Sequence, residues 1–165
     1  SYEIDLSTIV PIVAKPHFVD NICPAAEAAG IPIDEAFLGS CNNGRIEDLR
    51  AGASLIKGKS VHPLVRFLVV PASQAVYRQA LEEGILQTFM EAGAIVMNPN
   101  CSVCWGSCQG VIGEGETLIS TGTRNFKGRA GHKDSFVYLA SAATVTASAI
   151  KGEIATADMI QQKGR

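Results

Sequence analysis

Residues 94–104 read Ala94-Ile95-Val96-Met97-Asn98-Pro99-Asn100-Cys101-Ser102-Val103-Cys104. The four apolar residues at the start are typical of a buried strand, and the Asn-Pro-Asn sequence that follows ends the strand in a loop. That loop carries a Cys-x-x-Cys pair. The stretch therefore predicts a strand that presents two thiols just beyond its carboxyl end.

Similar strand-like runs occur on both sides of this stretch, and they alternate with stretches that have helical spacing of apolar residues. We expect residues 1–34 to be mostly extended, with turns. Strands are expected at 36–38, 66–70, 94–97, 117–121 and 136–140. Helices are expected at 25–29, 45–57, 73–84, 85–93, 141–151 and 157–162. In the helix capped by Ser73, Val76, Ala80 and Leu81 are expected to face inward. The alternation predicts the α/β class: a mostly parallel sheet in a three-layer α/β/α arrangement.

Composition limits the classes of protein to consider. A length of 165 residues predicts one domain spanning 1–165, and 47% hydrophobic with 18% charged residues is typical of a globular chain. A net charge of -2 without a basic run argues against a large nucleic-acid interface. No apolar run is long enough to span a bilayer. Five cysteines and no sign of secretion predict reduced thiols or a metal centre in a cytoplasmic protein.

A third cysteine, Cys41, stands in the turn 39–44 directly after the expected strand 36–38. Loops that leave the carboxyl ends of parallel strands meet at one edge of a sheet, where ligands bind. We therefore expect Cys41, Cys101 and Cys104 to share one site. Thiolates bind soft metals and iron–sulfur clusters. Downstream, the loop 122–129 carries two arginines, whose forked side chains bind carboxylates or phosphates.

Two other interpretations of the thiols remain open. A Cys-x-x-Cys pair in an α/β protein is also typical of a redox dithiol, although such a pair usually opens a helix, and glycines follow closely here at 106 and 110. A zinc site requires a fourth ligand at a recognisable spacing. The candidates form no familiar pair: Cys23, Cys108, His17, His62 and His132. We interpret Cys23 and Cys108 as small buried packing residues without a functional role.

Five blocks of sequence carry a family resemblance. They are Lys15-Pro16-His17-Phe18-Val19-Asp20-Asn21, Gly39-Ser40-Cys41-Asn42-Asn43-Gly44-Arg45-Ile46-Glu47-Asp48-Leu49-Arg50, Cys101-Ser102-Val103-Cys104, Arg124-Asn125-Phe126-Lys127-Gly128-Arg129 and Tyr138-Leu139-Ala140-Ser141-Ala142-Ala143-Thr144-Val145. In order and spacing, the chain resembles the aconitase family of iron–sulfur hydro-lyases. Within it, the likeness is to the large subunits of 3-isopropylmalate dehydratase and homoaconitase.

The resemblance implies a [4Fe-4S] cluster in which Cys41, Cys101 and Cys104 each bind one iron. The fourth iron, which has no protein ligand in this family, binds the substrate. The resemblance also implies that Arg124 and Arg129 bind substrate carboxylates. Two further residues are expected beside the cluster, namely Ser40 and Asn43.

The resemblance further implies that this chain is the third domain of a large subunit. The intact enzyme would isomerise a 2-hydroxy di- or tricarboxylate, first 3-isopropylmalate in leucine biosynthesis, with homoaconitate, citrate or a methylated malate as alternatives. It would need the remaining large-subunit domains and a small swivelling subunit. We therefore expect the isolated chain to be inactive and its cluster to be lost after aerobic purification. The alternatives of another class are a non-catalytic iron–sulfur or zinc-binding regulatory domain and a dithiol redox domain.

Overall fold

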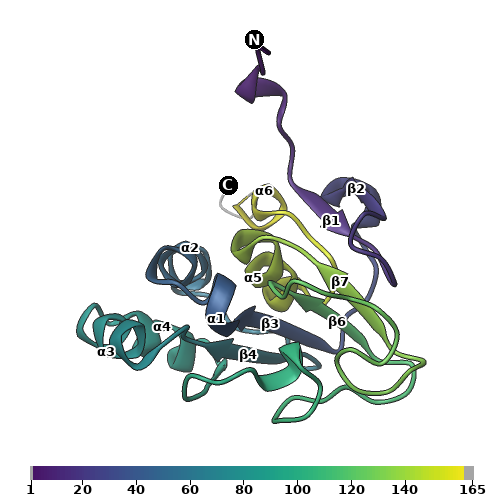
Figure 1. Cartoon of the computed structure of the whole chain (residues 1–165). Helices are drawn as coiled ribbons and strands as arrows, with labels where there is room; N and C mark the ends of the chain where they lie inside the picture. Colours follow the sequence, from purple (N-terminus) through teal and green to yellow (C-terminus); the bar gives the residue numbers. More distant parts are fainter. Residues whose placement is uncertain (1, 162–165) are drawn as a thin grey trace.

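The computed structural model describes residues 2–161, which contain a seven-stranded sheet in the order β2-β1-β7-β6-β3-β4-β5 (Figure 1). Strands β3 to β7 pair in parallel, and β1 and β2 add an antiparallel pair beside β7. The strands are β1 (Ile12–Ala14), β2 (Ile22–Pro24), β3 (Glu35–Gly39), β4 (Arg66–Val70), β5 (Ile95–Val96), β6 (Thr117–Ser120) and β7 (Phe136–Leu139). The predicted α/β class with a mostly parallel sheet is confirmed.

The strand order reverses at the centre of the sheet. From β3 the chain moves outward through β4 to β5, and it then returns to the other side of β3 to form β6 and β7. The carboxyl ends of β3 and β6 therefore lie side by side, while the connections that leave them diverge. In open α/β sheets this switch point is where ligands bind.

The predicted helices occur close to their expected positions, and three short ones were not predicted. The helices are α1 (Ser40–Asn43), α2 (Ile46–Ile56), α3 (Gln74–Glu82), α4 (Ile85–Glu91), α5 (Ala142–Lys151) and α6 (Ala157–Gln161), with 3-10 turns η1 (Leu6–Thr8), η2 (Ala25–Ala28) and η3 (Ser102–Cys104). The three that were not predicted are α1, η1 and η3. Ser73 and Ser141 cap α3 and α5, because each side chain accepts a hydrogen bond from a backbone amide in the first turn. Gln162, the last residue of the expected final helix, lies outside the described residues.

One buried position in α3 was predicted wrongly. Ala80 is buried and Val76 is half-buried, as expected, but Leu81 is 60% exposed. Successive residues of a helix are rotated by about 100°, so a narrow contact stripe that includes Ala80 leaves its neighbour outside.

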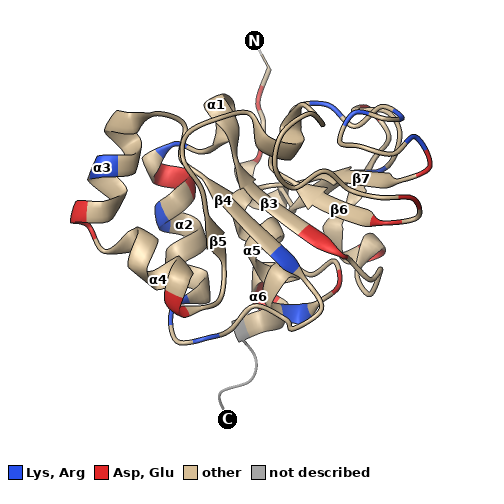
Figure 2. Ribbon diagram, turned by 90° about the horizontal axis from the view of Figure 1, so that it is seen from below, with Lys and Arg blue, Asp and Glu red and all other residues tan. Residues whose placement is uncertain are grey.

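The amino-terminal edge of the parallel strands is closed by ion pairs. Arg66, the first residue of β4, donates through Nε to the fully buried Glu35 at 2.9 Å. Its two terminal nitrogens donate to Glu116, each at 2.9 Å. Figure 2 shows the acidic and basic segments side by side at this end of β3 and β4. The charged side chains at this edge therefore pair with one another, although the buried Oε1 of Glu35 has no partner among the described residues.

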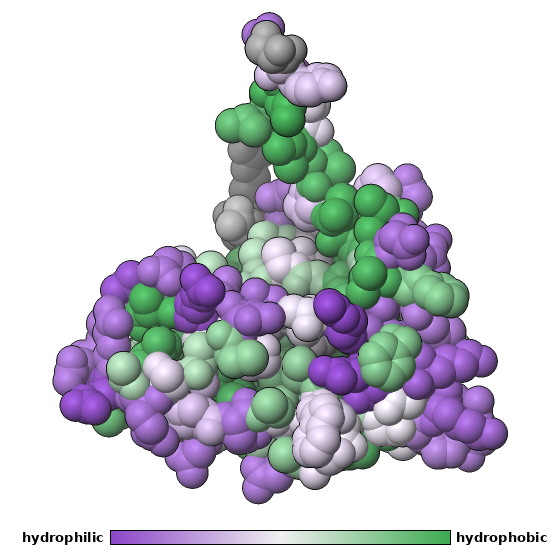
Figure 3. All heavy atoms as spheres, viewed as in Figure 1, coloured by the Kyte–Doolittle hydropathy of each residue, from purple (hydrophilic) through white to green (hydrophobic). Residues whose placement is uncertain are grey.

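The N-terminal segment extends away from the sheet and exposes apolar side chains (Figure 3). Within it, β1 and β2 pair as short strands where the sequence indicated only extended chain and turns. The exposed apolar residues of this segment are Tyr2, Ile4, Leu6, Ile9, Val10, Ile12, Phe18, Val19 and Ile22. We call them the apolar ridge.

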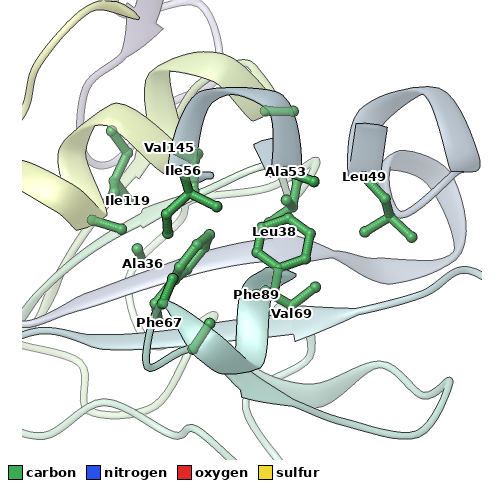
Figure 4. Packing of buried hydrophobic residues seen from close by; sticks show 14 of the residues in the cluster. Ala36, Leu38, Leu49, Ala53, Ile56, Phe67, Val69, Phe89, Ile119 and Val145 are labelled. Carbon is green, nitrogen blue, oxygen red and sulfur yellow. The ribbon is translucent and has the colours of Figure 1, made fainter. Parts of the chain in front are cut away.

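Alternate residues of the central strands serve two separate cores. Ala36 and Leu38 of β3 belong to the core beneath α2, α4 and α5, which Figure 4 shows from close by. Phe37, between them, points to the opposite face and belongs to a second core. The connections on either side of β6, residues 97–116 and 121–135, cover that face through residues such as Val103 and Ile112. The three-layer arrangement is thus confirmed, with η3 and long connections forming one of the outer layers.

Candidate functional site

The three predicted ligand thiols stand at the same edge of the sheet. Cys41 lies in α1, immediately after β3, and Cys101 and Cys104 lie at either end of the η3 turn that follows β5. All three are free cysteines; Cys41 and Cys101 are exposed and Cys104 is half-buried. The expectation that these loops leave the carboxyl ends of parallel strands is confirmed.

Helix α1 is held from both sides. The backbone carbonyl of Gly44 accepts a hydrogen bond from the amide of Ala72, which follows β4, at 2.8 Å. On the other side, the Asn43 side-chain amide donates to the carbonyl of Thr121, which follows β6. These bonds fix the short helix that carries Cys41 relative to the strands on either side of β3.

The loop that carries the other two thiols is tied down at its centre. Ser102 is fully buried, and its hydroxyl donates to the carbonyl of Gln109 at 2.8 Å. The amide of Cys104 donates to the carbonyl of Cys101 at 3.1 Å, which closes the turn. A Cβ atom added to Gly122 would lie 3.7 Å from the Cys104 sulfur, so this thiol reaches the end of β6.

Backbone strain is concentrated beside the thiols. In residues 2–161, two non-glycine residues have positive φ angles, Ser40 at 75° and Ser102 at 46°. The first directly precedes Cys41 and the second directly follows Cys101. Such conformations are costly for residues with a Cβ atom, and they recur at functional sites.

The arginine loop joins the first matched block to the site. Asn125 is buried, and its side-chain amide donates to the carbonyls of Lys15 at 2.8 Å and Phe18 at 3.2 Å. Arg124, next to it, is exposed and donates from Nη1 to the carbonyl of Thr123 at 2.6 Å. A pocket of about 170 Å³ is lined by His17, Phe18, Val19, Arg124, Asn125 and Phe126.

Arg129 packs against the cysteine loop. Gly106, two residues past Cys104, approaches the Arg129 carbonyl so closely that an added Cβ atom would lie 2.5 Å from that oxygen. The Arg129 guanidinium carbon lies 5.6 Å from the ring centroid of Phe126. Its Nε is buried and has no hydrogen-bond acceptor within the part of the chain that the structure describes. A buried donor of this kind is available to an anionic ligand.

The donors at this edge are soft. A zinc ion needs four converging ligands, and no three His, Cys, Asp or Glu side chains between residues 2 and 161 converge as ligands of one metal ion. An iron–sulfur cluster is held by thiolates that bind different irons. Three free thiols on neighbouring loops provide soft donors of that kind. The histidines weighed for zinc, His17, His62 and His132, belong to no such group.

The dithiol alternative and the two remaining cysteines are also placed by the structure. Cys101 precedes a three-residue 3-10 turn and Cys104 is its last residue, whereas a redox pair usually opens a longer helix. Cys23 is half-buried, less than expected, and packs against the larger core. Cys108 is exposed, so the interpretation of it as a buried packing residue was wrong. It lies on the loop closed by Ser102, which keeps it at the surface.

A larger pocket of about 460 Å³ opens between the apolar ridge and the end of β6. Its polar lining includes Asn43 and Thr121, and its apolar lining includes Ile12, Val19 and Leu139. Sequence reasoning missed Thr121. The only signal for it was a pair of hydroxyl residues at the end of an apolar strand.

Comparison with known proteins identifies the family. A family model described as "Aconitase family (aconitate hydratase)" matches residues 19–152. The match covers most of the chain, and the chain therefore belongs to the aconitase family.

Several curated relatives are similar to nearly the whole chain. The 3-isopropylmalate dehydratase large subunit of Aquifex aeolicus is 52% identical over 96% of this chain and 38% of that protein. The large subunit 1 of Methanopyrus kandleri is 51% identical over 92% of this chain and 36% of its own length. The large subunit of Hydrogenobaculum sp. is 53% identical over 93% and 36% respectively. The chain thus spans little more than a third of these relatives. Among its described helices, none is long and apolar enough to cross a membrane.

Proposed function

We propose that this chain is the third domain of the large subunit of an iron–sulfur hydro-lyase. The intact enzyme would dehydrate and rehydrate a 2-hydroxy dicarboxylic acid, and we infer 3-isopropylmalate as its substrate. One observation carries this proposal. Sequence blocks that lie far apart meet in contacts of their loops, α1 with the end of β6 and residues 15–18 with the arginine loop, in a chain about half identical to 3-isopropylmalate dehydratase large subunits. The chain would act in cytoplasmic amino-acid biosynthesis.

Cys41, Cys101 and Cys104 would hold a [4Fe-4S] cluster, and Ser40 and Asn43 would lie beside it. When bound, the cluster supplies a Lewis-acidic iron that polarises the C–OH bond to be broken. The chain itself would orient the thiols that hold the cluster. It holds the short helix α1 between two neighbouring loops and places Cys104 against the end of β6. Soft, exposed thiols on separately anchored loops support this assignment.

Arg124 and Arg129 would bind the carboxylates of the substrate. A guanidinium donates two parallel hydrogen bonds to a carboxylate, which fixes both its position and its plane. The unpaired Nε of Arg129 and its contact with the cysteine loop support a role beside the thiols. Arg124 is exposed at the rim of the small pocket that also contains His17.

The remaining large-subunit domains and a small subunit would complete the site. The apolar ridge supports this part of the proposal, because so many exposed apolar side chains on one segment mark a surface that another part of a protein covers. The relatives' additional length is sufficient for such a cover. We therefore expect no turnover by the isolated chain.

The proposal can be tested with a chimera. The segment of the Aquifex aeolicus large subunit that matches this chain is replaced by this chain, and the chimera is combined with the small subunit of that enzyme under anaerobic conditions. Formation of the unsaturated acid from 3-isopropylmalate is then followed by its ultraviolet absorption. We expect turnover by the chimera, none after Cys41→Ser, and unchanged turnover after Arg78→Met, an exposed position on α3.

A chimera that folds with its small subunit and binds iron, but dehydrates no 2-hydroxy di- or tricarboxylate, would contradict the hydro-lyase assignment. Turnover of citrate or homoaconitate in preference to 3-isopropylmalate would contradict only the choice of substrate.

A further inference from the structure

We propose that Thr121 is a positioning residue that sets the distance between the Cys41 helix and the loop after β6. The proposal rests on the proposed function, in that the Cys41 helix would carry a ligand of the cluster and the loop after β6 would lie against a second ligand, Cys104. Thr121 itself is 2% exposed, and no role for it follows from the cysteines or the arginines.

The Thr121 hydroxyl bridges two strands at the point where their connections diverge. Its oxygen accepts a hydrogen bond from the amide of Gly39, the last residue of β3, at 2.9 Å. Its proton faces two carbonyl oxygens of the same strand, that of Gly39 at 3.2 Å and that of Phe37 at 3.4 Å. Strand β6 ends at Ser120, one residue before Thr121, so its backbone makes no further strand pairing with β3 there. The Thr121 hydroxyl takes the place of those backbone hydrogen bonds.

The backbone of the same residue bonds to both sides as well. Its amide donates to the Phe37 carbonyl at 3.0 Å. Its carbonyl accepts the side-chain amide of Asn43, from the last turn of α1. Thr121 therefore contacts the strand before Cys41 and the helix that contains it.

The next residue along the chain links this bridge to the second pair of thiols. Gly122 lies against the Cys104 sulfur, with 3.7 Å between that sulfur and a Cβ atom added to the glycine. A shift of residues 121–122 relative to β3 would change the separation of Cys41 and Cys104. Valine at position 121 would fill the same volume but leave the buried Gly39 amide without its acceptor, and the strand ends would separate to hydrate it.

The first readout needs no iron. Backbone hydrogen exchange is measured by mass spectrometry on this chain, its Thr121→Val and Thr121→Ser variants, and Thr146→Val. Thr146 is a matched control, because it is a fully buried threonine of α5 whose hydroxyl donates to the Ala142 carbonyl at 2.8 Å. We expect exchange in 39–44 to accelerate at least tenfold in Thr121→Val, to return towards the parent in Thr121→Ser, and to change less than twofold in Thr146→Val.

The second readout is iron retention by the chimera described above. The same substitutions are introduced, and the loss of visible cluster absorption is timed after dilution into a chelator. We expect Thr121→Val to lose its cluster at least tenfold faster than Thr121→Ser and Thr146→Val. Asn43→Ala, which removes the other side-chain bond of the bridge, is expected to shift both readouts in the same direction and remains usable if Thr121→Val fails to fold.

The two readouts separate the possible failures. Equal exchange in residues 39–44 for Thr121→Val and Thr146→Val would overturn the positioning role, whatever the iron content. A parent chimera that binds no iron would contradict the proposed function, while the exchange measurement would still decide the role of Thr121.

Discussion

The two edges of the same parallel sheet differ in how their polar groups are satisfied. At the amino-terminal edge, Glu35, Arg66 and Glu116 form an ion network with three hydrogen bonds, in which Glu35 Oε1 alone is buried without a partner among the described residues. At the carboxyl edge, the thiols are free and the buried Nε of Arg129 has no acceptor in the described chain. Both non-glycine residues with positive φ, among those described, also lie at the carboxyl edge.

The difference indicates which edge serves stability and which serves chemistry. The amino edge pairs its charged side chains with one another, and its one buried atom without a partner among the described residues is Glu35 Oε1. The carboxyl edge maintains strained and unsatisfied groups, and such a cost persists where the surrounding structure holds the groups in place for another purpose. The switch point between β3 and β6 explains why these groups gather at one edge.

The largest effect is expected from removing an arginine at the carboxyl edge. In the active chimera, Arg129→Met is expected to lower kcat/KM by on the order of 10²–10³-fold, because a charged partner of the substrate carboxylate is lost. Arg129→Lys retains the positive charge but not the forked guanidinium, and it is expected to lower kcat/KM about tenfold. Steady-state kinetics with Arg78→Met as control measures both. Equal kinetics for Arg129→Met and the control would remove this residue from the site.

At the amino edge, Arg66→Met is expected to reduce stability and leave the carboxyl edge unchanged. The substitution leaves Glu35 buried without its partner, which we expect to lower the free energy of unfolding by about 3 kcal/mol at pH 8. Arg50→Met is the control. Its pair with Glu83 lies at the surface, where solvent screens the two charges, and is expected to contribute much less than the buried pair. Denaturant unfolding monitored by circular dichroism measures both free energies of unfolding. Similar losses in Arg66→Met and Arg50→Met would contradict the view that the buried pair at the amino edge contributes more to stability than the surface pair.

A smaller effect is expected from the titration of Glu35. Burial raises the pKa of its carboxyl to about 7, although Arg66 donates a hydrogen bond to it. The folded chain therefore keeps this proton at pH values where the unfolded chain has lost it. The stabilisation of the fold that comes from this bound proton is complete below about pH 4.5 and is lost as the pH rises through about 7.

We expect stability to fall by about 2 kcal/mol between pH 5 and pH 8 from this group alone. Glu116 stays ionised in this range, because its hydrogen bonds from Arg66 lower its pKa. Glu35→Gln removes the titrating carboxyl and is expected to flatten the dependence. Denaturant melts at both pH values provide the measurement. If stability fell equally steeply with pH in Glu35→Gln, the pH dependence would come from another titrating group.

The smallest effect is expected at Cys108. This thiol is exposed on the loop beyond the Cys-x-x-Cys pair and belongs to none of the contacts that join the site. Cys108→Ser is expected to change neither iron content nor unfolding by more than experimental error. Loss of half or more of the iron in this variant would add a fourth thiol to the carboxyl edge.

The sequence predicted the five parallel strands and the edge at which the thiols lie, because both follow from local patterns, but it did not predict β1 and β2. Continuous apolar runs such as 67–70 mark strands buried on both faces, and each parallel strand delivers its loop to the same edge. The sequence alone therefore assigns Cys41 and Cys101 to the carboxyl edge of the sheet.

Contacts between distant loops were not predictable in this way. The bond from Asn43 to Thr121 and those from Asn125 to the segment 15–18 join residues about 80 to 110 positions apart. No periodic pattern of apolar residues in the sequence indicates such hydrogen bonds. The exposure of Leu81 and Cys108 was missed for a related reason, since it depends on what the rest of the chain leaves uncovered.

The most direct test of the account is the iron content of the chimera after anaerobic reconstitution with iron and sulfide. We expect about four irons per chain in the parent and in Cys108→Ser, with visible absorption typical of thiolate-bound clusters. We expect that absorption and most of the iron to be lost in each of Cys41→Ser, Cys101→Ser and Cys104→Ser, while unfolding of the iron-free chains changes little. A full cluster in any one of these three variants, or none in the parent, would contradict the three-thiol site at the carboxyl edge.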